Sequence, residues 1–480
     1  MLRRVLQAPL GNATRKQWKK SLSQDSLSRA LYTPGRSVHT SCCLAKAGTV
    51  SPDVAEVNHL DGIKSRRMYI DDIYQHITND GVKDLEIQED GKRLQITWDD
   101  GHVSRFHAVW LRHMCHSAET MPHTTTILVD FSKIDIDSLR VTSAVMDGPE
   151  VIVLTYESDS GEVYHEGPIL TKFLRYQCYS EAAAEERSAQ RAMQFNKEKI
   201  IPEIDCGEIM AGDKGLYKWL QALSNVGICL VKNVPTKRGA IREVAERIAP
   251  IQRSIYPDVF DVESSPKPMN AAYTGIALDL HMDMIHYESP PGLQLLHCIE
   301  FDECIEGGGN YFVDLHEIAH NFKQEYPDLF YTLTRVPACH ETLDYKRAYP
   351  DLPAHVRIQR PLITVNHRDE IVSVVWQPMS IAALQVHEKD VVLFYKAYKQ
   401  FYTMIHYCDS KYENRLRPGD MISFNNRRVL HARHAYTENG RRLLQGAYIN
   451  ISEFQSQVQI FHNKYGGGRW PTRCGSIDWQ

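Results

Sequence analysis

Three His-x-Asp tripeptides contain the side chains of this sequence that are best suited to bind a metal ion. They lie at His59–Asp61, His281–Asp283 and His367–Asp369, and with 22 histidines in the chain one such tripeptide carries little information by itself. The middle copy differs from the others in its downstream partner. About 150 residues further on, a Pro-Gly-Asp turn that starts at Pro418 leads into an apolar segment ending at His431.

Two histidines and one carboxylate can occupy one face of a ferrous ion and leave the opposite face open. We therefore predict an Fe(II) site formed by His281, Asp283 and His431, with His434 as the second choice for the last ligand. Arg442 opens the next apolar segment, where a hairpin return would bring it beside the ligands. Its guanidinium could bind the carboxylate of 2-oxoglutarate through two parallel hydrogen bonds. The pattern predicts an Fe(II), 2-oxoglutarate-dependent oxygenase that consumes O2.

Short apolar segments surround these side chains and must position them. Between residues 195 and 460, strand-like segments predominate and helices gather mainly near the start. We expect strands at 227–232, 292–298, 311–313, 362–365, 371–376, 421–424 and 443–451, and helices at 216–223, 242–248, 315–326 and 391–407. This order predicts an α+β fold centred on a double-stranded β-helix, a jelly-roll or cupin-like barrel.

The other segments suggest further divisions of the chain. Short strands and turns over 85–180 indicate a small β-rich N-terminal module, with one strand expected over 103–110. A helix is expected over 180–199, because acidic residues come early in this segment and basic residues late. We assign 46–84 to a linker and entry segment, 195–460 to the oxygenase domain and 461–480 to a C-terminal tail.

The first 45 residues are rich in arginine, lysine, serine and threonine and contain a single acidic residue, Asp25. This composition is typical of a mitochondrial transit peptide and predicts a location in the mitochondrial matrix. A disordered basic tail is the alternative.

Composition excludes some classes of protein. The net charge is −5, so no general basic field favours nucleic acid as a partner. No apolar run approaches the ~18 residues of a membrane span, so we expect no membrane insertion. The 11 cysteines lack regular spacing, which argues against a disulfide framework.

Longer motifs allow a more specific interpretation. Around the metal motif His281–Asp283 (HMD), the sequence contains Ala108–Arg112 (AVWLR), Ala272–Gly275 (AYTG), Pro290–Cys298 (PPGLQLLHC) and Gly446–Tyr448 (GAY). With these motifs the sequence resembles the γ-butyrobetaine/trimethyllysine dioxygenase family, and γ-butyrobetaine dioxygenases in particular. The resemblance extends from about residue 85 to residue 458.

The resemblance implies roles for individual residues. It places iron at the same three ligands and 2-oxoglutarate at Arg442 and Asn270, with ascorbate as a possible reductant. It also implies a small-molecule trimethylammonium substrate, held in an aromatic cage, and a possible homodimer. Ring faces suit a quaternary ammonium, which has no hydrogen to donate. The cage positions are Tyr256, Phe260, Tyr273 and Tyr448.

Phe260 stands where γ-butyrobetaine dioxygenases have a tryptophan, which would weaken the cage without abolishing it, and two further positions depart from their pattern at the acid end of the pocket. Met284 stands where a tyrosine helps to bind the substrate carboxylate, and Gln377 replaces an asparagine that assists it. The ammonium end of the pocket is therefore expected to be preserved and the acid end altered. The favoured reaction is hydroxylation of γ-butyrobetaine to carnitine; hydroxylation of trimethyllysine and a non-catalytic betaine-binding role are the alternatives.

The N-terminal module of this family binds zinc through Cys-x-Cys-x-x-Cys and a distant histidine. Here the run is Cys115-His-Ser-Ala-Glu-Thr120, which keeps only the first cysteine. Closed structural zinc sites need four ligands. Because His113, His116 and His123 are expected to be solvated loop residues, we predict no structural zinc.

Overall fold

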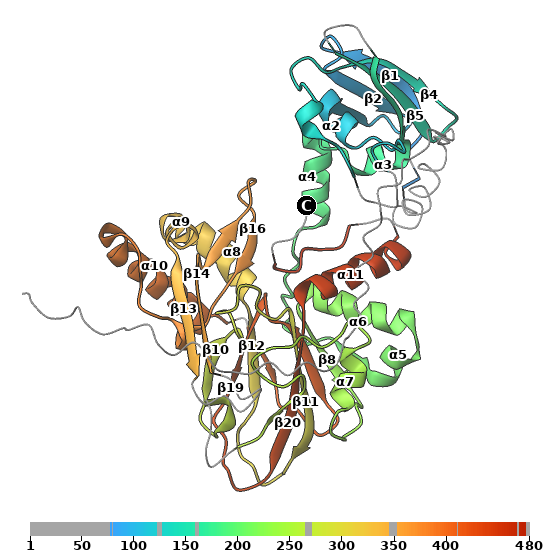
Figure 1. Cartoon of the computed structure of the whole chain (residues 1–480). Coiled ribbons are helices and arrows are strands. Elements are labelled where there is room, and N and C mark those ends of the chain that lie inside the picture. The colour runs from blue at the N-terminus through green and yellow to red at the C-terminus, as the bar shows by residue number, and fades with distance from the viewer. Residues whose placement is uncertain are drawn as a thin grey trace, which may run out of the picture. The chain divides into compact units, whose positions relative to one another are not determined.

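The computed structural model describes residues 77–78, 80–121, 127–158, 163–264, 271–344, 353–409, 411–467 and 470–476 (Figure 1). The predicted transit peptide and Asn270 lie outside these residues, as does nearly all of the predicted linker.

The N-terminal module contains two three-stranded antiparallel sheets, with orders β1-β2-β3 and β4-β5-β6. Trp98, Phe106 and Tyr156 are fully buried in their common core. The strands are β1 (Val82–Gln88), β2 (Arg93–Trp98), β3 (Val103–His107), β4 (Arg140–Met146), β5 (Val151–Glu157) and β6 (Val163–Leu170), and the helices are α2 (Ala108–His113) and α3 (Thr171–Tyr176).

Two expectations in this part of the chain were wrong. The strand expected over 103–110 ends at His107, because Ala108, Leu111 and Arg112 are buried together on one face of α2. The helix expected over 180–199 is α4 (Glu181–Gln190), which ends where the backbone N–H of Arg191 bonds back to carbonyl groups of the last turn.

The larger part of the chain contains a six-stranded sheet of order β7-β8-β18-β11-β20-β9, antiparallel except for the β7–β8 pair. A four-stranded sheet of order β10-β19-β12-β17 lies beside it. In Figure 1, β8, β11 and β20 belong to the first sheet, and β10, β19 and β12 to the second. The strands are β7 (Glu203–Asp205), β8 (Ile228–Lys232), β9 (Phe260–Val262), β10 (Leu278–His281), β11 (Leu293–Phe301), β12 (Asn310–Asp314), β17 (Lys411–Asn414), β18 (Met421–Asn425), β19 (Val429–Arg433) and β20 (Arg442–Ile449).

The inner faces of the two sheets pack against each other, as in a jelly roll. Phe312 of β12 and Phe424 of β18 meet there with ring centroids 5.4 Å apart, and the His431 ring centroid lies 5.0 Å from that of Phe424. The predicted double-stranded β-helix is confirmed. Because successive strand residues point to opposite faces, this packing also decides which side chains face the interior.

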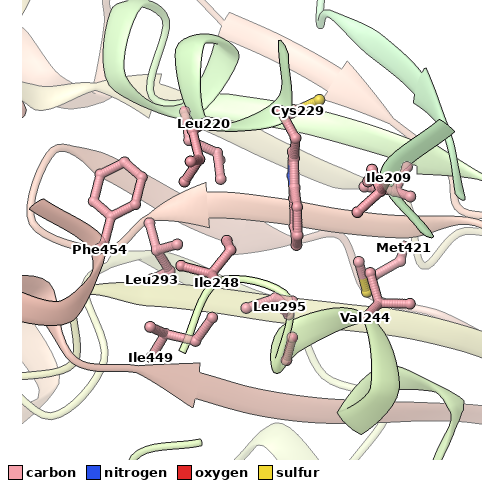
Figure 2. Packing of buried hydrophobic residues seen from close by; sticks show 14 of the residues in the cluster. Ile209, Leu220, Cys229, Val244, Ile248, Leu293, Leu295, Met421, Ile449 and Phe454 are labelled. Carbon is pink, nitrogen blue, oxygen red and sulfur yellow. The ribbon is translucent and has the colours of Figure 1, made fainter. Parts of the chain in front are cut away.

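Helices cover the outer face of the six-stranded sheet. Leu293 and Leu295 of β11 and Ile449 of β20 point toward these helices, and Figure 2 shows them packed with Leu220, Ile248 and Phe454. Each fully buried leucine or isoleucine contributes roughly 1.5–3 kcal/mol. The intervening residues of the same strands must therefore face inward. The helices are α5 (Cys206–Ala211), α6 (Asp213–Asn225), α7 (Ala240–Ala245) and α11 (Ile451–Tyr465).

The outer face of the four-stranded sheet is covered by a second group of elements. Leu280, Val313 and Leu430 pack there against helices and two short hairpins in another apolar cluster. The elements are α8 (Leu315–Glu325), α9 (Pro327–Arg335), α10 (Glu388–His406), β13 (Ala338–Asp344), β14 (Ala354–Arg360), β15 (Ile363–Val365) and β16 (Ile371–Val374). Among the described residues, none of these helices or the others is long and apolar enough to cross a membrane.

Candidate active site

His281 and His431 lie directly opposite each other on neighbouring antiparallel strands, β10 and β19. Their ring centroids are 4.0 Å apart. Asp283 follows two residues after the end of β10, and its Oδ1 lies 3.4 Å from Nε2 of His281 and 3.9 Å from Nε2 of His431. One ligand atom from each of the three lies within 4.8 Å of the other two. We call these three residues the metal corner.

Neighbouring groups orient the metal corner. Nδ1 of His281 lies 2.7 Å from the carbonyl oxygen of Asp279, and a hydrogen bond donated there leaves the lone pair of Nε2 free for a metal ion. Asn426 holds the loop of Asp283: its Oδ1 accepts from the Asp283 N–H at 2.8 Å, and its Nδ2 donates to the Asp283 carbonyl at 3.0 Å. His281 and Asp283 are thus held in position by these hydrogen bonds before any ion binds.

The charges of the metal corner suit a cation. Burial alone would raise the pKa of Asp283, but the hydrogen bond from His281 and the charges of His431 and His281 lower it below its ordinary value. Burial lowers the pKa of His431 to about 3, and the neighbouring His281 adds to this shift. Burial would also lower the pKa of His281, yet Asp283 raises it overall. Asp283 and His431 are therefore in the protonation state that metal ligation requires, whereas His281 must release the Nε2 proton that it shares with Asp283 when an ion binds.

Tyr448 supports the same carboxylate. It lies on the inward face of β20, and its hydroxyl donates a 2.7 Å hydrogen bond to Oδ2 of Asp283. This leaves Oδ1, the oxygen nearer to both histidines, to point toward the metal position. Tyr448 therefore has two roles: its hydroxyl orients the metal ligand Asp283, and its ring lines the cavity.

Arg442 begins β20 and is 5% exposed. Its Nε and Nη1 are buried without a hydrogen-bond partner among the described residues. The guanidinium lies against the rings of Tyr436 and Phe301, at 5.1 and 5.4 Å from their centroids, and burial lowers its pKa to about 10. A buried, still protonated guanidinium with unused donors is well suited to a carboxylate ligand, so the residues present fit 2-oxoglutarate.

Three aromatic rings form a continuous surface near the metal corner. The ring centroids of Tyr256 and Phe260 are 5.7 Å apart, and those of Phe260 and Tyr448 are 5.2 Å apart. Gly446 makes this arrangement possible, because a Cβ atom there would lie 2.3 Å from the Phe260 ring. Tyr273 lines the same cavity from the segment before β10.

One cavity of about 310 Å³ collects all of these groups. Among the described residues, every side chain predicted for the site lines it, apart from the alternative ligand His434. They are His281, Asp283, His431, Arg442, Tyr256, Phe260, Tyr273, Tyr448, Gln377 and Met284. His434 is exposed and lies against Tyr311 with ring centroids 4.7 Å apart, outside this lining.

Comparison with known proteins shows which family the chain belongs to. The family model "Taurine catabolism dioxygenase TauD, TfdA family" matches residues 187–448, and the model "Gamma-butyrobetaine hydroxylase-like, N-terminal" matches residues 85–165. The γ-butyrobetaine dioxygenase of Pseudomonas sp. (strain AK-1) is 30% identical to this chain, over 76% of the chain and 93% of the relative. The chain belongs to the TauD/TfdA dioxygenase family.

Two human relatives extend the comparison. Human γ-butyrobetaine dioxygenase is 26% identical, over 81% of this chain and 99% of its own, and human mitochondrial trimethyllysine dioxygenase is 27% identical, over 75% of this chain and 83% of its own. This dioxygenase is accordingly an enzyme of the Fe(II), 2-oxoglutarate-dependent class, which confirms the predicted activity class and its use of O2.

Met284 and Gln377, the two residues expected at the acid end of the dioxygenase pocket, make different kinds of contact. Met284 packs against Phe260 and Tyr448 and adopts a left-handed backbone conformation, with φ of 56°. Gln377 uses both ends of its amide locally: Nε2 donates to the Met282 carbonyl at 3.1 Å, and Oε1 accepts from the N–H of Met379. Met284 has no donor for a substrate carboxylate, and the Gln377 amide is already engaged.

Several residues that shape this site were not predicted. Asn426 fixes the Asp283 loop, and Arg433 donates to the carbonyl oxygens of Ala272, Thr274 and Ile276, which holds the segment carrying Tyr273. Asn426 belongs to a polar run that interrupts the apolar segment before His431, and Arg433 follows that histidine by two residues. Polar residues placed among the apolar residues of a barrel were the available signal.

The N-terminal module of the dioxygenase contains a second cluster, here called the module corner: Cys115, Ser117, Thr120 and His165. Sγ of Cys115 lies 3.3 Å from Nε2 of His165, and the Ser117 hydroxyl donates to Oγ1 of Thr120 at 3.1 Å. Burial raises the pKa of Cys115, so its thiol stays protonated. Among the described residues, only the metal corner forms a group of three possible metal ligands.

One of the three histidines near the module corner, His116, differs from the solvated loop residue that we expected. His116 is fully buried, and its Nδ1 accepts from the backbone N–H of Leu170 at 3.2 Å. The expectation was wrong for this residue because the loop folds back on β6. His123 lies outside the described residues. The absence of structural zinc stays a prediction.

Proposed function

We propose that this dioxygenase hydroxylates an unactivated C–H bond of a trimethylammonium acid, with γ-butyrobetaine as the first candidate and carnitine as its product. The observation that carries the proposal is the aromatic surface of Tyr256, Phe260 and Tyr448 beside the metal corner in one cavity. Each ring face can contribute about 0.5–2 kcal/mol to binding a quaternary ammonium. The relative with 30% identity is named a γ-butyrobetaine dioxygenase.

Specific residues would hold the reactants. His281, Asp283 and His431 would ligate Fe(II), and Arg442 would bind the far carboxylate of 2-oxoglutarate, with Asn270 proposed beside it on the resemblance alone. When bound, Fe(II) and 2-oxoglutarate would supply the electrons that activate O2, which is the oxidant of the reaction. The chain itself would hold the substrate ammonium against the rings and keep Asp283 ionised and correctly oriented.

Trimethyllysine is the second candidate because the acid end departs from the γ-butyrobetaine dioxygenase pattern. Met284 cannot donate a hydrogen bond, and the Gln377 amide is engaged locally. An amino acid substrate would need different partners there from those of a simple acid. Relatives named trimethyllysine dioxygenase match the chain at 26–28% identity.

The direct test supplies purified protein with Fe(II), 2-oxoglutarate, ascorbate and O2, and then adds each betaine separately. Succinate release and the hydroxylated product are followed by mass spectrometry. We expect γ-butyrobetaine to gain one oxygen atom, with the product formed in equal amount to succinate. Succinate formation that no trimethylammonium acid accelerates would contradict the proposed substrate class, and faster turnover of trimethyllysine would reverse the order of the candidates.

We further propose a mitochondrial matrix location and a division of the chain into a transit peptide (1–45), a linker (46–84), a module (85–180), an oxygenase domain (195–460) and a tail (461–480). The basic N-terminal composition supports the location, as do relatives named mitochondrial trimethyllysine dioxygenases. Fusion of residues 1–45 to a fluorescent protein tests it: we expect import into mitochondria, and a diffuse signal throughout the cell would contradict the proposal.

A further inference from the structure

Several polar side chains line the cavity away from the metal corner, and most already have partners. The Ser380 hydroxyl donates to the Gln377 carbonyl at 3.3 Å and lies 3.3 Å from Nδ1 of His340. Glu341 is paired with His355 through Oε1. The Gln377 amide is used at both ends. These groups hold the cavity wall together and have limited capacity left for a ligand.

His286 differs from them. It lines the cavity, is 8% exposed, and its Nε2 is buried without a hydrogen-bond partner among the described residues. Leaving a buried donor or acceptor unpaired costs roughly 1–3 kcal/mol, so such groups in folded proteins usually have a purpose. A group that enters the cavity with the substrate would supply the missing partner.

The backbone fixes His286 in this position. Met284 takes a left-handed conformation, and the N–H of Tyr287 donates to the Met284 carbonyl at 3.0 Å, which closes a turn around His286. Arg360 anchors the turn from β14, because its Nη2 donates to the carbonyl oxygens of Tyr287 at 2.6 Å and Glu288 at 2.9 Å. The imidazole therefore has little freedom to find another partner.

Burial and the charge of Asp283 act in opposite directions on the pKa of His286. Burial lowers the pKa of His340 to about 4, and the charges of Arg360 and His286 lower it further. Burial lowers the pKa of His286 to about 4 as well, against the opposing charge of Asp283, so its ring is neutral at pH 7 and has a single N–H to donate. Once Asp283 binds a metal ion, its negative charge is offset and opposes an anion near His286 less strongly.

We propose that His286 binds the carboxylate of the trimethylammonium acid through Nε2–H, in place of the hydroxyl that Met284 cannot provide. The inference rests on the proposed function, since it needs a substrate with an acid group in this cavity. It makes His286 a specificity-determining residue that touches the substrate. The ammonium would lie against the rings of Tyr256, Phe260 and Tyr448, and the acid would lie against His286.

The test compares γ-butyrobetaine with its neutral carboxamide in the wild type and three variants. In His286→Ala we expect KM for the acid to rise about 10- to 100-fold, because one hydrogen bond to a charged group is lost, while KM for the carboxamide changes less than about threefold. His286→Gln retains an N–H donor and should recover a large part of the acid preference. His387→Ala, at an exposed histidine outside the cavity lining, should behave as the wild type.

A binding measurement distinguishes an error in the role of His286 from an error in the proposed function. Calorimetry with Ni(II)- and 2-oxoglutarate-loaded protein, which does not turn over, measures the acid-to-carboxamide affinity ratio directly, and melting curves show whether each variant is folded. A folded His286→Ala variant that keeps the wild-type ratio overturns the inference, even if turnover is normal. Wild-type protein that binds the acid preferentially through His286 but never hydroxylates it contradicts only the proposed reaction. Wild-type protein that binds neither compound overturns both.

Discussion

The metal corner and the module corner each place a histidine beside another potential metal ligand, but only the metal corner completes a set. In the metal corner, two imidazoles and a carboxylate converge, and the pKa of Asp283 is lowered so that the carboxylate is ionised. In the module corner, Cys115 lies beside His165, and the hydroxyl groups of Ser117 and Thr120 bond to each other. The pKa of Cys115 is raised, so its thiol keeps its proton.

The difference shows what a metal site needs beyond suitable residue types. Ligands must be numerous enough, deprotonated, and oriented by other groups before the ion arrives. Asn426 and Tyr448 provide that orientation for Asp283. The module corner is instead a small hydrogen-bonded network, which can stabilise the fold without an ion.

The largest effect should come from removing one ligand of the metal corner. We expect His431→Ala to lower substrate-dependent succinate formation by more than about a hundredfold, because two protein ligands hold Fe(II) poorly. His434→Ala is the matched control: this histidine lies three residues away but is exposed, and its loss should leave the rate within about twofold. Equal losses in both variants would contradict the assignment of the last ligand.

A smaller effect is expected at the 2-oxoglutarate end of the cavity. Arg442→Gln should raise KM for 2-oxoglutarate about 10- to 100-fold, since a charge-assisted hydrogen bond pair is lost. Arg441→Gln is the control, because Arg441 is half exposed and pairs with Glu263 and Glu300 at the surface. Steady-state kinetics with varied 2-oxoglutarate measure both, and an unchanged KM in the Arg442 variant would remove this residue from the site.

Tyr448→Phe sharpens the comparison further, because it removes a hydroxyl and keeps the ring. We expect Fe(II) affinity to fall about tenfold through loss of the bond to Asp283, while the affinity for the trimethylammonium group changes little. Tyr407→Phe, at an exposed tyrosine, serves as the control. Metal titration followed by substrate titration separates the two effects; unchanged iron affinity would show that the hydroxyl is dispensable.

The smallest effect should appear in the module corner. After iron is stripped, metal analysis should find no tightly held zinc, and Cys115→Ser should change the free energy of unfolding by about 1 kcal/mol or less. Its protonated thiol should also resist alkylation at neutral pH. One tightly bound zinc per chain, lost in the Cys115 variant, would make the two corners alike and refute the prediction.

The barrel was predictable from the sequence because its strands are short apolar segments separated by clear turn signals. β18 (Met421–Asn425) and β12 (Asn310–Asp314) cover the expected segments, and β20 (Arg442–Ile449) differs by a residue or two at its ends. Helix α11 (Ile451–Tyr465) was missed, because the strand expected over 443–451 was carried through Asn450, whose side chain caps this helix by accepting from the N–H of Ser452.

The metal corner was predictable for a different reason: its residue types, order and strand context allow few other chemistries. Residues that act through loop geometry were not. His286 enters the cavity through a turn in which Met284 adopts a left-handed conformation, which nothing in a methionine side chain favours. Asn426 likewise acts by bonding to a backbone segment far away in the chain. Such roles depend on tertiary contacts, so local pattern cannot reveal them.

The most direct test of the metal corner is an anaerobic titration with Fe(II) in the presence of 2-oxoglutarate, performed on the wild type and on His281→Ala, Asp283→Ala and His431→Ala. The wild type should bind one Fe(II) per chain tightly, and each folded variant should lose tight binding. Tight binding of one Fe(II) per chain that persists in any of the three folded variants would show that the ion lies elsewhere.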